Sequence, residues 1–130
     1  MVVLLALPGC GLDGSGNAPA SRTVRVTERD FRVSAPTRLA AGTVSLSVRN
    51  RGPIAHELIV VRKHGRVLPL RSDGITIDED KLASDEVGTL EAGEPGVRQL
   101  TVRLAPGTYE MFCNMAGHFM AGMHRRLVVQ

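Results

Sequence analysis

Apolar and polar residues alternate along much of the chain from Thr23 onward. Val44, Leu46 and Val48 are separated by polar residues, and residues at every second position fall on one face of a β-strand. This pattern predicts a half-buried strand over residues 43–48. The same period of two recurs elsewhere, and it predicts strands near residues 24–33 (with an irregularity near 28–30), 56–62, 97–104, 109–113 and 125–129.

Turn-forming residues separate these segments. Gly42, the pair Gly52-Pro53 and the pair Pro106-Gly107 each lie between two alternating runs. Helical periodicity is almost absent, and only residues 78–85 are expected to form a short helix. Several short strands joined by glycine and proline turns are typical of a sandwich. The sequence therefore predicts an all-β fold, an antiparallel Greek-key β-sandwich.

Length and composition indicate one domain. The chain has 130 residues, enough to bury a core, and we expect this domain to span residues 23–130. Aromatic residues make up only 3% of the chain, so the core must consist of Val, Leu, Ile and Met. The net charge of +3 is small, and no basic run is interleaved with aromatics, which argues against a nucleic-acid platform.

The acidic residues are unevenly distributed. Most of them fall between residues 73 and 94, a part of the chain without clear alternation. One interpretation is a solvated surface loop, and the other is a patch that orients a cationic partner, because complementary charge mainly raises association rates. The residues concerned are Asp73, Asp78, Glu79, Asp80, Asp85, Glu86, Glu91 and Glu94.

The richest chemistry lies between the last two predicted strands. Cys113, His118 and Met123 follow one another there with four residues between each pair. A thiolate, an imidazole and a thioether are three of the four ligands of a blue-copper site, which combines two histidines and a cysteine with a weak axial methionine. The second histidine must then come from elsewhere. The alternation points His56, like Cys113, toward the inner face of its strand.

Glycines precede two of these residues. Gly117 lies before His118, and Gly122 lies before Met123. Glycine tolerates backbone angles that other residues avoid, so an unusual backbone angle would be tolerated at both positions.

This loop resembles that of the cupredoxins, most closely the plastocyanin-like and rusticyanin-like small blue-copper proteins. The resemblance covers roughly residues 23–130. Besides the loop over residues 109–123, it includes residues 50–57 (Asn-Arg-Gly-Pro-Ile-Ala-His-Glu) and 104–109 (Leu-Ala-Pro-Gly-Thr-Tyr). It implies the cupredoxin fold, which agrees with the sandwich that the alternation predicts.

The resemblance also implies a site and an activity. Carried over residue by residue, the ligands of one copper ion are His56, Cys113, His118 and Met123. The implied function is one-electron transfer through a mononuclear type 1 copper centre. In the family, electrons usually pass through the histidine of the Cys-His-Met loop, which here is His118.

Neighbouring residues are candidates for supporting the ligands. Asn114 follows the cysteine and Asn50 lies before the distant histidine, so both are candidates for hydrogen bonds near the sulfur. Phe112, Met115 and Phe119 are candidates for an apolar rim around the exposed edge of the loop histidine.

The sequence is compatible with alternatives for the axial ligand and for the metal. Met111, Met115 and Met120 are other candidates for the axial position or for hydrophobic packing, although Met123 fits the family spacing. Zinc is also compatible with a Cys/His pocket, because copper's advantage depends on metal availability.

Other functions receive less support from the residues. A copper carrier would use exposed ligands such as Met115, Met120 and His124 and is the main alternative. An enzyme with further metal centres would need more histidines than His64 and His124 supply, and a binuclear copper site would need a second loop cysteine. We therefore expect a non-enzymatic, monomeric protein.

The N-terminal residues predict a location outside the cytoplasm. Residues 1–10 resemble the end of a bacterial lipoprotein signal, in which Cys10 would be lipidated, although the apolar stretch is short and no Lys or Arg precedes it. Residues 11–22 are small and polar, as in a flexible tether. We expect a lipid-anchored protein, periplasmic or on the cell surface. Its redox partner would be a membrane respiratory complex or a soluble cytochrome.

Overall fold

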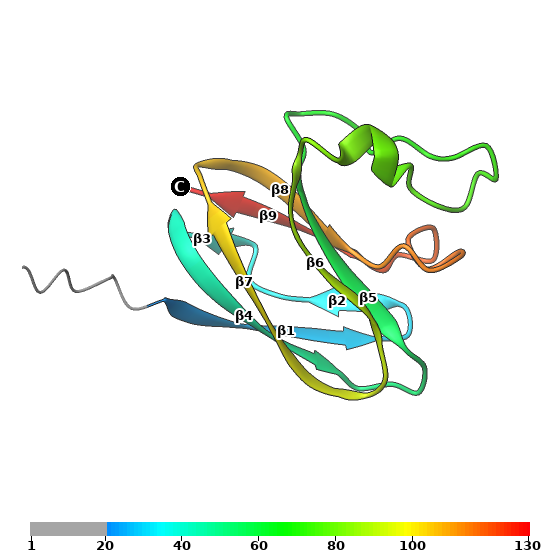
Figure 1. Cartoon of the computed structure of the whole chain (residues 1–130), viewed down its shortest axis with the longest axis horizontal. Coiled ribbons are helices and arrows are strands. Elements are labelled where there is room, and N and C mark those ends of the chain that lie inside the picture. Colours follow the sequence, from blue (N-terminus) through cyan, green and yellow to red (C-terminus); the bar gives the residue numbers. More distant parts are fainter. Residues whose placement is uncertain (1–20) are drawn as a thin grey trace, which may run out of the picture.

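The domain forms nine strands in two sheets that pack face to face (Figure 1). The computed structural model describes residues 21–130. A four-stranded sheet has the order β2-β1-β4-β7, and a five-stranded sheet has the order β3-β9-β8-β5-β6. The predicted β-sandwich is therefore confirmed.

The four-stranded sheet contains most of the first half of the domain. Its strands are β1 (Arg22–Arg29), β2 (Arg32–Ser34), β4 (Gly42–Asn50) and β7 (Gly96–Leu104). The irregularity expected near residues 28–30 is the turn that separates β1 from β2.

The five-stranded sheet carries the segments that lead to the predicted ligands. Its strands are β3 (Arg38–Leu39), β5 (His56–Arg62), β6 (Glu86–Gly93), β8 (Gly107–Phe112) and β9 (His124–Val129).

Each sheet is mixed, a detail that the prediction of an antiparallel sandwich did not include. β1 runs parallel to β4, and β3 runs parallel to β9, whereas the other neighbouring pairs are antiparallel. The chain leaves the first sheet after β2, pairs β3 with the second sheet and then returns as β4. This crossover brings β4 back beside β1 in the same direction.

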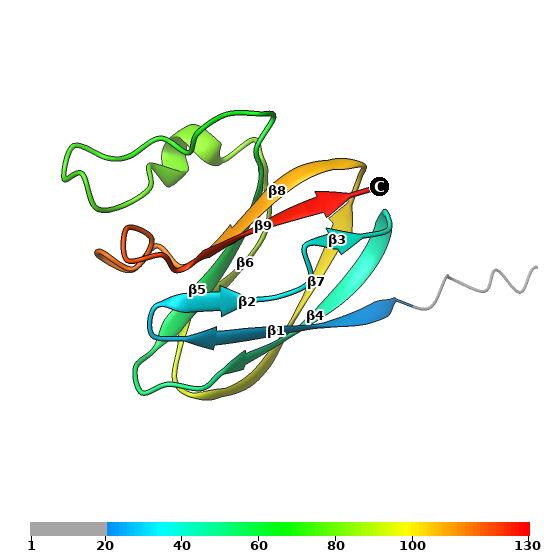
Figure 2. The ribbon, with the colours of Figure 1, turned by 180° about the vertical axis from the view of Figure 1, so that it is seen from behind.

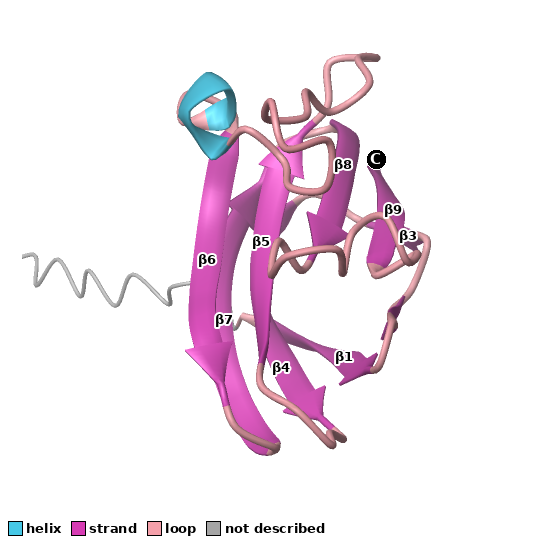
Figure 3. Ribbon diagram, turned by 90° about the vertical axis from the view of Figure 1, so that its right-hand side faces the viewer, coloured by secondary structure: helices cyan, strands magenta, loops and turns pink. Residues whose placement is uncertain are grey.

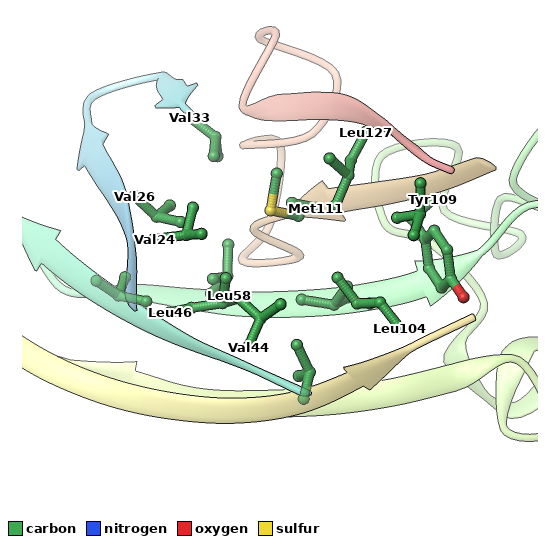
Figure 4. Close-up of a cluster of buried hydrophobic side chains, with 14 of the residues drawn as sticks. Val24, Val26, Val33, Val44, Leu46, Leu58, Leu104, Tyr109, Met111 and Leu127 are labelled. Carbon is green, nitrogen blue, oxygen red and sulfur yellow. The ribbon is translucent and has the colours of Figure 1, made fainter. Parts of the chain in front are cut away.

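The predicted alternation fills the space between the sheets. Side chains such as Val26, Leu46, Leu58 and Leu127 are at most 1% exposed, and they meet in one aliphatic core (Figure 4). The buried Tyr109 donates a hydrogen bond from its hydroxyl to the Ala105 carbonyl at 2.8 Å, so its one polar atom is satisfied.

An excursion between β5 and β6 covers the outer face of the five-stranded sheet. It contains the single-turn 3₁₀ helix η1 (Glu79–Leu82). The short helix predicted over residues 78–85 is thus limited to this one turn. Figure 3 shows this turn in cyan above β6. The excursion has its own apolar cluster against the sheet, made of Ile59, Val61, Leu68, Ile77, Leu82 and Phe112.

Several acids of the 73–94 stretch have partners within the domain. Asp73 accepts hydrogen bonds from the backbone of Ile75 and Thr76, and Asp78 lies 2.9 Å from the Lys81 ammonium. These contacts favour the interpretation of a solvated loop, and the docking patch stays a prediction.

Charge differs between the two sheets. The strands of the four-stranded sheet contain a single acidic residue, Glu28, which is buried. Their outward positions carry Arg25, Arg29, Arg32, Arg49 and Arg103, which are all exposed.

Within residues 21–130, no helix is long and apolar enough to cross a membrane.

Candidate metal centre

His56, Cys113 and His118 meet at one end of the sandwich. His56 is the first residue of β5, Cys113 directly follows β8, and His118 lies on the loop before β9. One potential ligand atom from each residue lies within 4.8 Å of the others. A metal about 2.0–2.3 Å from each atom would span at most about 4.6 Å between two of them, so the cluster is close to the size of a coordination shell.

His56 is held with one ring nitrogen free. The residue is 0% exposed, and its Nε2 lies 2.8 Å from Asp30 Oδ1. In a neutral ring, this contact with a carboxylate places the proton on Nε2 and leaves the lone pair on Nδ1. Nδ1 is buried and has no hydrogen-bond partner among residues 21–130. Buried polar atoms are rarely left without a partner, and a metal ion would satisfy this one. The carboxylate–histidine contact is also the usual support for a ligating imidazole.

Cys113 presents a buried thiol to the second histidine. Its Sγ lies 3.4 Å from His118 Nδ1. Burial raises the pKa of the Cys113 thiol, while the backbone amides of Glu57 and Met115 act in the opposite direction. The raised pKa keeps the thiol protonated in the absence of a metal. A coordinating metal would deprotonate it outright.

His118 is the member of the cluster nearest to solvent, at 7% exposed. Burial lowers its pKa, and the neighbouring His56 lowers it further. Its ring centroid lies 5.3 Å from that of His56 and 5.0 Å from that of Phe31. A lowered pKa favours the neutral imidazole, which is the form that binds a metal.

Backbone hydrogen bonds fold the loop back upon itself. The Met123 amide donates to the His118 carbonyl at 3.0 Å, and the Cys113 amide donates to the Met123 carbonyl at 3.1 Å. Gly117 and Gly122 have φ angles of 81° and 103°, in the region that glycine tolerates and other residues avoid. These contacts place Met123 beside two cluster members. Its side chain is 0% exposed, whereas that of Met120 is 55% exposed.

Asn50 stabilises the loop that leads to His56. Its side-chain amide donates to the carbonyls of Ile54 at 2.9 Å and Gly93 at 3.0 Å, and its oxygen accepts from the Gly52 amide at 2.7 Å. These contacts fix the turn before β5. Within residues 21–130 its side chain makes no hydrogen bond to the sulfur.

Asn114 connects the ligand loop to the excursion. Its side chain bonds both backbone groups of Ile77, at 2.6 and 3.0 Å, and donates to Glu79. Its backbone amide donates to Glu57 at 2.8 Å. In the described part of the chain, the side chain of Asn114 makes no hydrogen bond to the sulfur of Cys113. Like Asn50, this residue instead positions the backbone around the cluster.

The aromatic contact of His118 is one that sequence reasoning missed. The predicted rim included Phe112 and Phe119, but these rings pack against each other at 5.6 Å beneath the excursion. Phe31, in the β1–β2 turn, contacts the histidine instead. Asp30, in the same turn, was also missed. The only signal in the sequence was the break in alternation at this turn.

The remaining histidines of residues 21–130 lie outside the cluster. His64 Nε2 lies 3.1 Å from Asp85, and His124 Nδ1 lies 2.9 Å from the buried Glu110. His124 also stacks on Phe119 at 4.6 Å. The predicted lipidation site, Cys10, lies outside the described residues.

Similarity to solved structures agrees with the predicted fold. Auracyanin from Roseiflexus castenholzii is 17% identical over 85% of this chain and 98% of its own (TM-score 0.62). Auracyanin A from Chloroflexus aurantiacus, described as a "blue" copper protein, is 21% identical over 83% and 98% (TM-score 0.61). Rusticyanin from Thiobacillus ferrooxidans is 21% identical over 85% and 79% (TM-score 0.61). No family profile and no curated protein sequence matches this chain. The similarities confirm the predicted cupredoxin fold.

Proposed function

We propose that this protein transfers single electrons through a mononuclear type 1 copper centre. His56, Cys113 and His118 would form the trigonal ligand set, and Met123 would be the weak axial ligand. The observation that carries the proposal is the buried cluster of two imidazoles and a thiol, in which His56 Nδ1 has no other partner in the described chain. The bound metal would supply the chemistry by alternating between Cu(I) and Cu(II).

The protein's own residues would keep the site ready for this change of oxidation state. Asp30 orients His56, and the loop hydrogen bonds hold Cys113 beside His118. All four proposed ligands are buried, which excludes water from the coordination shell. A site held in one arrangement needs little rearrangement when an electron arrives or leaves.

His118 is the proposed route for the electron. It is the least buried of the four proposed ligands, and its ring contacts Phe31, which is 45% exposed. A redox partner that covers Phe31 would therefore reach the edge of the site without opening the core. We propose a redox protein as this partner, either a membrane respiratory complex or a soluble cytochrome.

The copper spectrum tests the site. The oxidised, copper-loaded protein should show an intense visible band from charge transfer between the thiolate and the metal. The Cys113→Ser variant should lose this band and keep the β-rich circular dichroism spectrum. Cys10→Ser removes the other cysteine of the chain and is the matched control, which should retain the band. An unchanged band in Cys113→Ser would disprove the assignment.

A second measurement separates electron transfer from copper delivery. An electron-transfer protein should cycle between its oxidised and reduced forms with no loss of copper. A carrier should lose its metal to a competing chelator in one of the two states. Among the exposed ligands that a carrier would need, Met120 is 55% exposed, whereas His124 Nδ1 lies 2.9 Å from Glu110.

We also propose that the domain works outside the cytoplasm, held at a membrane by a lipid on Cys10. β1 begins at the end of the sandwich opposite the ligand loop (Figures 1 and 2). A tether that enters the domain there would direct the metal centre away from the membrane surface. This orientation would leave the edge of His118 accessible to a partner.

A further inference from the structure

The β1–β2 hairpin carries a concentration of positive charge on its outer face. A hollow of about 390 Å³ lies there, close to the turn that holds Asp30. We call it the arginine hollow, and its lining residues are Thr27, Arg29, Asp30, Arg32, Ser34 and Arg51.

The strand register explains how the lining is built. Thr27 lies opposite Ser34, and Arg29 lies opposite Arg32 in the antiparallel pair. Glu28, which lies between Thr27 and Arg29 in the sequence, points inward and is buried. Because side chains alternate along a strand, these two residues and the residues opposite them point outward together. Like charges directly opposite one another destabilise a strand pair. The hairpin therefore gathers two guanidinium groups and two hydroxyl groups at some expense of stability.

The positive charge has little compensation from the protein. Among residues 21–130, the side chains of Arg29, Arg32 and Arg51 make no ion pair or hydrogen bond. The one acid of the hollow, Asp30, is already engaged by His56 at 2.8 Å. Three guanidinium groups thus face one carboxylate, which leaves an excess of positive charge.

We propose that the arginine hollow binds an oxyanion of the phosphate class. Guanidinium groups match the planar, two-pronged geometry of phosphate oxygens. The hydroxyls of Thr27 and Ser34 are further donors on the same face. A dianion would balance the excess charge and remove the repulsion between Arg29 and Arg32. The proposal needs no metal, so it is independent of the proposed electron transfer.

The phosphate group could belong to a free anion or to a lipid headgroup. The arginine hollow is lined by Asp30 of the β1–β2 turn, and β1 begins at the opposite end of the sandwich from this turn (Figure 2). A tether entering at the start of β1 would hold the hollow away from the bilayer. This geometry favours the free anion.

Titration of the metal-free full chain with inorganic phosphate tests the site. At constant ionic strength, we expect saturable binding by calorimetry and a melting temperature that rises with phosphate concentration. Arg32→Gln should weaken binding at least tenfold and abolish the rise. Arg103→Gln removes the same charge from an exposed position of the same sheet outside the hollow, and it should bind like the wild type.

Vesicles distinguish the two sources of phosphate. If the hollow binds a lipid headgroup, the wild type should sediment with phosphatidylglycerol vesicles but not with phosphatidylcholine vesicles. Arg32→Gln should then abolish this sedimentation. A response to inorganic phosphate without such sedimentation would assign it to the free anion. Equal responses of Arg32→Gln and Arg103→Gln, or no response to either phosphate source, would overturn the proposal.

Discussion

Glu28 is a carboxyl group that the fold buries completely on the inner side of β1. Neither of its side-chain oxygens has a hydrogen-bond partner within residues 21–130. Burial raises its pKa from 4.5 to about 7, although the positive charge of Arg98 acts in the opposite direction. An ionised carboxylate in this position is unfavourable, so the folded protein retains the proton over a range in which the unfolded chain has lost it.

The free energy of unfolding should therefore depend on pH through Glu28. Its pKa is higher in the folded state, so its contribution is fully present below pH 4.5 and is lost as the pH rises to about 7. We expect a decrease of about 3 kcal/mol across this interval. Urea denaturation at several pH values measures it. Glu28→Gln should flatten the dependence, and Glu94→Gln, at an exposed position, should not. An equal slope in wild type and Glu28→Gln would contradict this account.

The axial position is the second prediction at the residue scale. Met123→Leu should retain copper and raise the reduction potential, because a thioether that stabilises Cu(II) is replaced by a hydrocarbon. A tenfold loss of preference for Cu(II) corresponds to about 59 mV, and voltammetry of the copper-loaded protein measures the shift. Met115→Leu and Met120→Leu are the controls. A larger shift in Met120→Leu than in Met123→Leu would move the axial role to Met120.

The candidate ligands were predictable from sequence because most of them lie on one short loop. Cys113, His118 and Met123 carry distinctive side chains at a fixed spacing, and the alternation gave the inward direction of Cys113 and His56. The contact between Asp30 and His56 was not predictable, because it joins residues 26 positions apart across two sheets. Only the placement of the β1–β2 turn against the start of β5 brings these two side chains together.

At the scale of elements, the excursion between β5 and β6 marks the limit of the sequence pattern. Its residues bury one side against the outer face of a sheet, but without a regular period of two or 3.6. Its position depends on contacts from elsewhere, such as the hydrogen bonds of Asn114 to Ile77. The parallel pairing of β1 with β4 escaped prediction for a related reason. Alternation identifies a strand and its buried face but does not identify its neighbour.

The excursion should contribute substantially to stability through its own apolar cluster. Leu82 is 4% exposed and packs in that cluster, so Leu82→Ala should lower the free energy of unfolding by about 2–4 kcal/mol. Chemical denaturation followed by circular dichroism measures the loss. Val67 lies in the same excursion and is 91% exposed, and Val67→Ala should change stability by less than about 0.5 kcal/mol. Similar effects of the two substitutions would show that the excursion is not packed as described.

At the scale of the whole molecule, the lipid anchor is the prediction that concerns location. If Cys10 is lipidated, the wild type should fractionate with membranes and Cys10→Ala should be released, when both carry any native upstream signal. Several acyl chains on one cysteine hold a protein firmly, whereas one chain anchors it only marginally. A chain that begins at Ser21 should be soluble and retain the copper spectrum. Equal membrane association of wild type and Cys10→Ala would rule out the lipid anchor.

The unequal charge of the two sheets makes the molecule an electric dipole, which its net charge of +3 does not reveal. Arginines cover the outer face of one sheet, while most acids lie on the other sheet and the excursion. A charged surface exerts a torque on such a molecule before contact, over a range of about 8 Å at physiological ionic strength. Encounters thus begin with the protein already rotated. How often the His118 end meets a partner then depends on the pattern of the partner's charges more than on their sum.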